Sequence, residues 1–209
     1  MDGDVAPLPA LLALAERHDA WLVVDDAHGI GVLGAGRGSL AHFGLRSARI
    51  VYMATLGKAL GGYGAFVAGE PALVDWLMQK ARTYVFSTAL PPAAAAVASV
   101  ALRLVAEHPA IVATLHQRIG EFRRACAREG VETASVTAIQ PVIVGDATRA
   151  VDLSGRLREL GHLVPAIRPP TVPEGTSRLR VSLSAAHSRE QVLALAAALG
   201  EVLRDGPAR

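Results

Sequence analysis

The sequence predicts an α/β protein built from two units, and three observations support that class. Trp21–Val24 is a short, continuous apolar run, which is typical of a strand buried on both faces of a parallel sheet. Segments with helical apolar spacing lie on both sides of it, as in proteins where strands and helices alternate. Later in the chain the composition shifts, and Arg178–Ser184 alternates polar and apolar residues like a strand with one buried face. We therefore expect one domain over residues 1–108 and a small α/β domain over residues 109–209.

In the first domain the elements follow from apolar spacing and from the positions of proline. Pro7 pre-sets the first turn of a helix whose apolar face holds Leu8, Leu11 and Leu12. The segment from Ala93 to Glu107 is so apolar all round that we expect it to be buried or shared between domains. The expected helices are 8–18, 71–82 and 93–107, and the expected extended segments are 21–24, 50–54, 65–68 and 84–88.

The second domain is expected to pack helices on a sheet that is partly antiparallel. Its first helix, over residues 111–128, carries Leu115, Ile119, Phe122 and Cys126 on one face and arginines on the other. A capping box of Ser188 and Gln191 begins its last helix, which runs to about residue 204. The other expected elements are strands over 139–144, 162–167 and 178–184 and a helix over 147–160.

Composition excludes several classes of function. The net charge is +2 and the basic residues are scattered, so no patch suggests a nucleic-acid surface. The chain is 51% hydrophobic and 19% charged, which supports a sizeable core and argues against disorder. No apolar run reaches membrane-spanning length. Cys126 is the single cysteine, which excludes a disulfide framework and favours a reducing, cytoplasmic compartment.

Chemically active residues follow two of the expected strands. Asp25, Asp26 and His28 come directly after the first strand, and Lys58 follows the second, within the glycine-rich stretch 55–64. Because ligands bind at the carboxyl edge of open α/β sheets, we expect these side chains to gather there. A lysine that is partly removed from water has a lowered pKa, and its neutral amine is the nucleophile that Schiff-base chemistry needs.

Two glycine patterns near these residues resemble nucleotide-binding motifs but do not satisfy them. Gly29, Gly31 and Gly34 spell the dinucleotide-binding fingerprint, but the chain continues as a loop and no helix opens there to face a pyrophosphate. A P-loop around Lys58 fails as well, because the next residue is Ala59 and not serine or threonine. Neither pattern therefore predicts a nucleotide site.

The residues at the strand ends leave two interpretations. One is a metal site of Asp25, Asp26 and His28, although no other ligand cluster supports it. The other, which we favour, is a pyridoxal phosphate site. In that site Lys58 forms the imine, a carboxylate keeps the pyridine nitrogen protonated and a histidine contacts the ring. Thr55 and the glycine-rich turn would supply hydroxyl and backbone N–H donors to the phosphate.

Three motifs resemble one enzyme family. Residues 24–29 (Val-Asp-Asp-Ala-His-Gly), 55–62 (Thr-Leu-Gly-Lys-Ala-Leu-Gly-Gly) and 87–92 (Ser-Thr-Ala-Leu-Pro-Pro) are similar to the α-oxoamine synthases. These are fold-type I, pyridoxal phosphate-dependent acyltransferases, which join an amino acid to an acyl thioester. The resemblance implies that the chain is the C-terminal part of such a transferase, with a partial large-domain sheet and a small C-terminal α/β domain.

The resemblance also implies roles for individual residues. Lys58 matches the Schiff-base lysine, Asp25 the partner of the pyridinium nitrogen and His28 the residue near the phenolic oxygen of the ring. Thr55 matches a phosphate contact, and Thr88 a phosphate contact that reaches across the interface of a homodimer. The resemblance therefore implies pyridoxal 5'-phosphate as the cofactor and no metal.

Two further motifs imply the substrates. Residues 138–145 and 166–176 resemble the family member that condenses L-alanine with a pimeloyl thioester, carried by acyl carrier protein or coenzyme A. Arg180 matches the arginine that binds the carboxylate of the amino acid, and Arg178, on the same face of its strand, is the weaker alternative. Glycine C-acetyltransferase is the enzymatic alternative within the family.

By comparison with this family, the chain begins in mid-fold. Family members are considerably longer, and the part without a counterpart here is N-terminal. We therefore expect a sheet with an unpaired edge and uncovered apolar residues, and a chain that is inactive as a synthase by itself. A non-catalytic fragment is the alternative from a different class of function.

Overall fold

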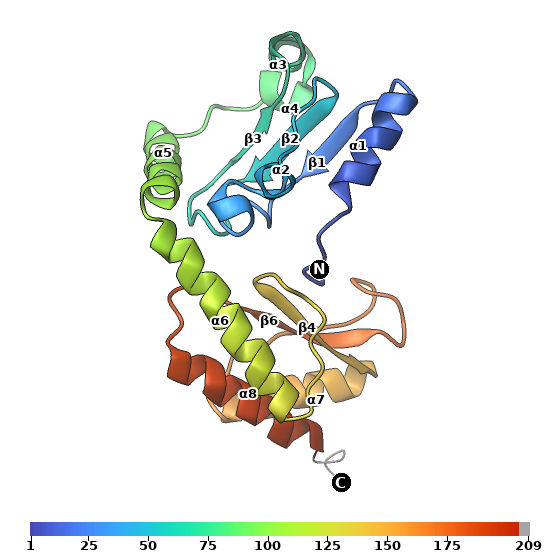
Figure 1. Ribbon diagram of the computed structural model, residues 1–209, viewed down its shortest axis with the longest axis vertical. Helices are drawn as coiled ribbons and strands as arrows, with labels where there is room; N and C mark the ends of the chain where they lie inside the picture. Colours follow the sequence, from blue (N-terminus) through green and yellow to red (C-terminus); the bar gives the residue numbers. More distant parts are fainter. Residues whose placement is uncertain (205–209) are drawn as a thin grey trace. The chain divides into compact units, whose positions relative to one another are not determined.

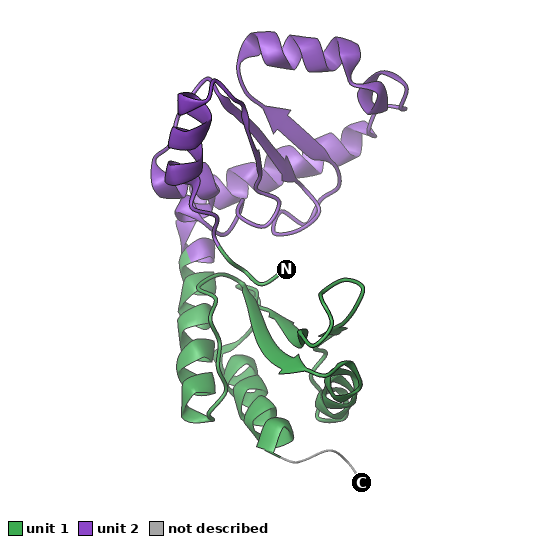
Figure 2. Ribbon diagram, turned by 90° about the vertical axis from the view of Figure 1, so that its right-hand side faces the viewer, with its two compact units in different colours: residues 1–4, 113–209 green, residues 5–112 purple. Residues whose placement is uncertain are grey.

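The computed structural model describes residues 1–204, which divide into two compact units (Figure 2). One unit spans Val5–Val112 and is called the lysine unit here, because it contains Lys58. The other, the C-terminal unit, combines Met1–Asp4 with the chain from Ala113 onward. The predicted boundary after residue 108 lies close to Val112, and the independence of the two units as domains stays a prediction.

The lysine unit is built on a three-stranded sheet. Its strands β1 (Leu22–Asp25), β2 (Ile50–Thr55) and β3 (Ala65–Ala68) lie in that order (Figure 1). β1 and β2 are parallel, and β3 is antiparallel to β2. Parallel strands need a crossover connection, which here consists of a glycine-rich loop and the short helix α2 (Ser39–Phe43). The three strands predicted from apolar runs are confirmed.

Helices cover one face of this sheet. α1 (Leu8–Arg17) buries Leu8 and Leu12 in a cluster with Val24 and Ile50, and the predicted helix is confirmed. Burial of such side chains stabilises the fold by about 1.5–3 kcal/mol each. A second cluster joins Ala98 of α5 (Pro92–Glu107) to Ile30, Ala54, Leu56 and Leu60.

The opposite face of the sheet is open to solvent. Val23 is 68% exposed and Val67 is 43% exposed. The prediction that the first strand is buried on both faces is wrong, because the helices of the described chain pack against one side of the sheet. We call this side the open face. Strand alternation and register assign to it Val23, Asp25, Val51, Met53, Thr55, Ala65 and Val67.

One further expectation for the lysine unit is wrong. The segment 84–88 was expected to be extended, but Tyr84 and Val85 lie in the short helix α4 (Arg82–Val85), which follows α3 (Pro71–Lys80). Their backbone N–H groups both donate to the carbonyl of Ala81, and this local bonding overrides the strand preference of aromatic and β-branched residues. The expectation that α5 is buried or shared between domains stays a prediction, since the helix buries Ala98 and leaves most of its surface exposed within the described chain.

The C-terminal unit contains an antiparallel sheet with the strand order β4-β6-β5. β4 (Ile139–Gly145) and β6 (Ser177–Ser182) confirm two predicted strands, whereas β5 shrinks to Ala166–Ile167. Three helices complete the unit, and Figure 1 shows them below this sheet or beside it. They are α6 (Pro109–Arg128), α7 (Ala147–Glu159) and α8 (Arg189–Arg204).

The predicted apolar face of α6 forms part of the core. Leu115 and Ile119 are buried, and Phe122 and Cys126 are fully buried. Burial, with a smaller contribution from the charge of Glu129, raises the pKa of the Cys126 thiol to about 12, so this cysteine serves packing and not nucleophilic chemistry. No single helix of the described chain is long and apolar enough to span a membrane; α5 and α6 meet that test only together, as a bent pair.

Glu121 connects two helices of the C-terminal unit. Gln117 Nε2 donates to its Oε1 at 3.0 Å, and Arg118 Nη1 donates to its Oε2 at 2.7 Å. Arg189, at the start of α8, approaches Oε1 at 3.5 Å. The hydrogen bonds from Gln117 and Arg118, and then the charges of the two arginines, lower the pKa of the Glu121 carboxyl.

We expect acid to destabilise the folded chain partly through Glu121. A carboxyl whose pKa is lower in the folded state stabilises the fold above its ordinary pKa of 4.5. That contribution is lost as the pH falls through the folded-state value. The free energy of unfolding should therefore decrease from about pH 6 to about pH 3, and decrease less in Glu121→Gln. Denaturant titrations measure this, with Glu132→Gln, at an exposed glutamate, as the control. Parallel curves for wild type and Glu121→Gln would contradict the prediction.

Candidate functional site

Lys58 lies in a tight turn that begins where β2 ends. The turn is closed by backbone hydrogen bonds from Leu56 N to Gly64 O and from Gly62 N to Leu56 O, both 2.8 Å long. Lys58 Nζ donates to Thr55 Oγ1 at 2.9 Å. The expectation that Lys58 is partly removed from water is wrong for this structure, because its side chain is exposed, whereas Leu56 and Leu60 of the same turn are buried.

A cavity opens beside this lysine. Its volume is about 530 Å³, and Lys58 and Thr55 both line it. The other lining residues come from the same turn, from β3 and from the loop before α5, and they are Gly57, Tyr63, Gly64, Ala65 and Leu90. An amine and a hydroxyl therefore share one concave surface. Tyr63 and Leu90 were not identified from the sequence, where nothing in their spacing distinguishes them from other exposed apolar residues.

Asp25 lies on the same side of the sheet. It ends β1 in register with Met53 of β2, and Thr55 follows Met53 on the open face. The Oδ1 atom of Asp25 accepts a hydrogen bond of 3.0 Å from the backbone N–H of Ala27. The parallel strands β1 and β2 thus end at one edge of the sheet, with Asp25 and Thr55 on the open face and Lys58 three residues after Thr55.

Asp26 points the other way. Only 5% of it is exposed, and its Oδ2 accepts hydrogen bonds from Ser39 N and from Tyr52 Oη, each at 2.7 Å. Burial, together with the hydrogen bond and the charge of Asp26, raises the pKa of Tyr52, which stays a protonated donor. Because the two carboxylates diverge, they do not form the metal site considered above. Within residues 1–204, no three histidine, cysteine, aspartate or glutamate side chains gather to hold a metal.

The remaining predicted residues do not line the cavity beside Lys58. His28 is exposed in the turn after β1, and Thr88 is exposed in the loop before α5, two residues ahead of the cavity residue Leu90. Arg180 belongs to the C-terminal unit, where it is half-buried on β6 and its Nε donates to Met1 O at 3.1 Å. Its neighbour Arg178 is buried in an ion pair with Asp2. The assembly of all these residues into one site stays a prediction.

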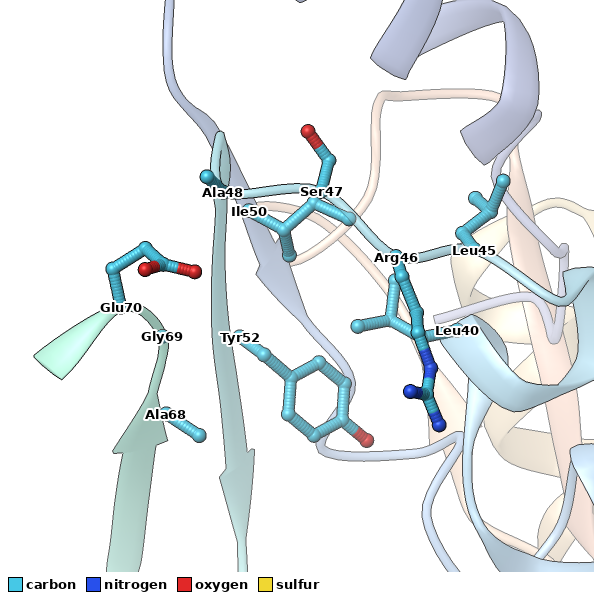
Figure 3. A pocket seen from close by; sticks show the side chains of 10 residues that line it. All are labelled: Leu40, Leu45, Arg46, Ser47, Ala48, Ile50, Tyr52, Ala68, Gly69 and Glu70. Atoms are coloured by element: carbon cyan, nitrogen blue, oxygen red, sulfur yellow. The ribbon is translucent and has the colours of Figure 1, made fainter.

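A second cavity lies at the other end of β2 (Figure 3). It has a volume of about 510 Å³, and Ile50 and Tyr52 of β2 line it on the covered side of the sheet. Arg46 and Glu70 are its charged lining residues. This cavity opens near the start of β2 and Lys58 follows its end, so the two cavities are distinct. This cavity could not be predicted from the sequence, because its walls come from α2, from the segment leading into β2 and from the end of β3, which only folding brings together.

The chemistry of the donor set at Lys58 fits pyridoxal phosphate. The cofactor needs an amine for its aldehyde, an anion for its ring nitrogen and hydroxyl or N–H donors for its phosphate. Lys58, Asp25 and Thr55 supply these three groups on one edge of the sheet. The residues present are therefore compatible with that cofactor.

Comparison with known proteins identifies the protein family of this chain. The family model described as aminotransferase class I and II matches residues 1–199, and the chain belongs to this family. Among curated proteins, it is 60% identical over 195 residues to 8-amino-7-oxononanoate synthase of Chromobacterium violaceum, covering 93% of this chain and 51% of that protein. The enzyme of the same name from Dechloromonas aromatica is 56% identical over 205 residues, covering 97% and 53%. The chain thus spans about half the length of the curated relatives it matches.

Several solved structures are similar to this chain in fold. Serine palmitoyltransferase of Sphingomonas wittichii superposes with a TM-score of 0.90 at 32% identity, covering 98% of this chain and 52% of that one. A structure of SPT with PLP gives a TM-score of 0.91 at 28% identity, with the same coverage. 8-Amino-7-oxononanoate synthase of Francisella tularensis gives 0.80 at 31% identity, covering 93% and 58%. This chain therefore has the fold of the matched part of these enzymes, which is somewhat more than half of each.

Proposed function

We propose that the protein catalyses the pyridoxal phosphate-dependent condensation of L-alanine with a pimeloyl thioester, carried by acyl carrier protein or coenzyme A, to give 8-amino-7-oxononanoate. This is a step of biotin biosynthesis, which takes place in the cytoplasm. The observation that carries the proposal is that Lys58 and Thr55 line one cavity, with Lys58 Nζ 2.9 Å from Thr55 Oγ1. Asp25 ends the neighbouring strand β1 at the same edge of the sheet. The similarity to enzymes of that name supports it.

Each residue has a task in this reaction. Bound pyridoxal phosphate supplies an electron sink for charge that develops on the α-carbon of the amino acid. Lys58 anchors the cofactor and, once displaced by the incoming amino group, moves a proton at that α-carbon. Asp25 holds the proton on the ring nitrogen, and Thr55 binds the phosphate through its hydroxyl. His28 is assigned to the phenolic oxygen of the ring. The α-carbon would bond to the acyl carbon as the thiol leaves, carbon dioxide would then leave the α-carbon, and a proton delivered by Lys58 would replace it.

Two assignments involve groups outside the cavity of Lys58. We assign Thr88 to the phosphate of a second protomer in a homodimer, because its exposed loop leaves it available to a neighbour. We assign Arg180 to the carboxylate of alanine, because Arg178 is already engaged by Asp2. Glycine C-acetyltransferase and a non-catalytic fragment remain the alternatives, and no observation favours either.

Release of carbon dioxide from carboxyl-labelled L-alanine tests the proposed function. The chain spans about half the length of its relatives, so the assay uses the chain alone and the chain joined to the amino-terminal half of the Chromobacterium violaceum enzyme. We expect release that depends on pimeloyl thioester in the joined protein. Glycine with acetyl-coenzyme A serves as the competing pair. Preference for that pair, or no release from the joined protein, would contradict the proposal.

Arg180→Lys is expected to weaken recognition of alanine. A guanidinium binds a carboxylate through two parallel hydrogen bonds, which an ammonium does not reproduce. The KM for alanine should rise by about tenfold or more, while the KM for the thioester stays close to that of the wild type. Steady-state kinetics with each substrate varied in turn measures this, and Arg158→Lys, at an exposed arginine of α7, is the matched control. A change confined to the KM for the thioester would assign the carboxylate to another residue.

A further inference from the structure

Asp26 is a buried carboxylate that the proposed chemistry does not use. It follows Asp25 directly, yet its side chain turns into the covered side of the sheet and meets Ser39 N and Tyr52 Oη. A buried charge is costly unless hydrogen bonds compensate it, and these two bonds do so. A buried carboxylate that binds both a neighbouring strand and the following loop, next to a proposed catalytic residue, points to a task of its own.

The bond between Tyr52 and Asp26 connects the two strands that carry the proposed site. Asp26 directly follows β1, and Tyr52 lies within β2, three residues before Thr55. The backbone N–H of Asp26 also donates to Met53 O at 2.8 Å. The strand end that presents Asp25 is therefore fixed to the strand that leads into the turn of Lys58.

The glycine-rich loop after β1 adds a second connection. At Gly38, with φ +92°, an added Cβ would lie 2.3 Å from Asp26 Oδ2 and 2.4 Å from Tyr52 Oη, so the loop closes directly over this hydrogen bond. At Gly31, with φ +78°, an added Cβ would lie 2.7 Å from the Cβ of Ala59, the residue after Lys58. One loop thus touches the carboxylate of Asp26 at one end and the lysine turn near the other. This contact explains Gly31, one of the three glycines that imitate a dinucleotide fingerprint.

We propose that Asp26 is a positioning residue: through Tyr52 and the loop of residues 29–38 it fixes the turn of Lys58 relative to Asp25. The inference rests on the proposed function for its chemical meaning, since that function requires the amine and the carboxylate at opposite ends of one ring. Asp26 itself touches neither cofactor nor substrate. Asp26 would influence the cofactor and the substrate by fixing the backbone positions of the Lys58 turn and of Asp25.

Hydrogen exchange on the full chain tests the connection without any cofactor. Tyr52→Phe removes the hydroxyl and keeps the ring, and Asp26→Asn is the second variant. In both, amides of residues 29–38 and of the turn 56–62 should exchange about tenfold faster or more, while amides of α1 keep their rates. Tyr84→Phe, which removes an equivalent hydroxyl from a side chain that is 62% exposed, is the control and should match the wild type. Faster exchange in the loop with an unchanged lysine turn would overturn the proposal, and so would equal acceleration throughout the unit.

A spectroscopic readout separates positioning from a purely structural role. With pyridoxal phosphate added, the absorbance of the cofactor bound to Lys58 is followed against pH. Displacing Asp25 from the ring nitrogen should shift the midpoint of this titration in Tyr52→Phe and Asp26→Asn, and shift it no further in the double variant. Reduced occupancy with an unchanged midpoint would show that Asp26 only stabilises the fold. If the joined protein binds no cofactor at Lys58, the proposed function fails, and the exchange experiment still decides whether the connection exists.

Discussion

In the chain joined to the amino-terminal half of the Chromobacterium violaceum enzyme, replacing Lys58 by alanine should abolish both the covalent attachment of pyridoxal phosphate and turnover. The amine is the group of the cavity that can bond to the aldehyde of the cofactor, and Thr55 Oγ1, 2.9 Å away, cannot replace it. Borohydride reduction followed by peptide mapping should place the pyridoxyl label on Lys58 in the wild type and nowhere in Lys58→Ala. Because the reduced bond is stable, the label reports the site of attachment independently of activity.

The chain offers a matched control for this experiment. Lys80 is its other lysine, at the end of α3, where Nζ lies 5.7 Å from the centre of the Trp76 ring. Lys80→Ala should keep the label and the activity of the wild type. Label on Lys80, or label that persists in Lys58→Ala, would disprove the assignment of Lys58.

Asp25→Asn should leave cofactor binding largely intact and lower kcat by about a hundredfold or more. A carboxylate stabilises a proton on the ring nitrogen by its charge, which a carboxamide of the same shape does not carry. Without that proton the ring accepts less charge from the α-carbon of the amino acid. The KM for alanine should change far less than kcat, because Asp25 is assigned to the ring and not to the substrate.

Rapid-mixing kinetics, with cofactor occupancy measured in parallel, provides the test of Asp25. Asp75→Asn, at an exposed position of α3 in the same unit, removes an equal charge away from the site and should behave as the wild type. Near-normal kcat in a fully loaded Asp25→Asn protein would contradict the role of Asp25. Loss of cofactor from that variant would instead assign Asp25 to binding.

The order of the elements and the residues at the strand ends were determined by the sequence. Short apolar runs predicted β1, β2 and β3, because a strand that packs into a core needs several apolar side chains over a short length. Helical spacing marked α6 and its buried face at Phe122 and Cys126. These patterns lie within single segments, so they can be recognised without knowing which other segments pack against them. They also placed Lys58 directly after a strand, where a turn was required.

The tertiary structure decided which sides of these elements are covered. Alternation along β1 places Asp25 and Asp26 on opposite faces, but the packing of α1 against Val24 decides that Asp26 is the buried one. The same packing leaves Val23 exposed, against the expectation from its apolar run. Tyr84 and Val85 became helical through hydrogen bonds to Ala81, although their side chains prefer strands. Periodicity defines the faces of an element, whereas burial depends on segments that are distant in the chain and become neighbours only on folding.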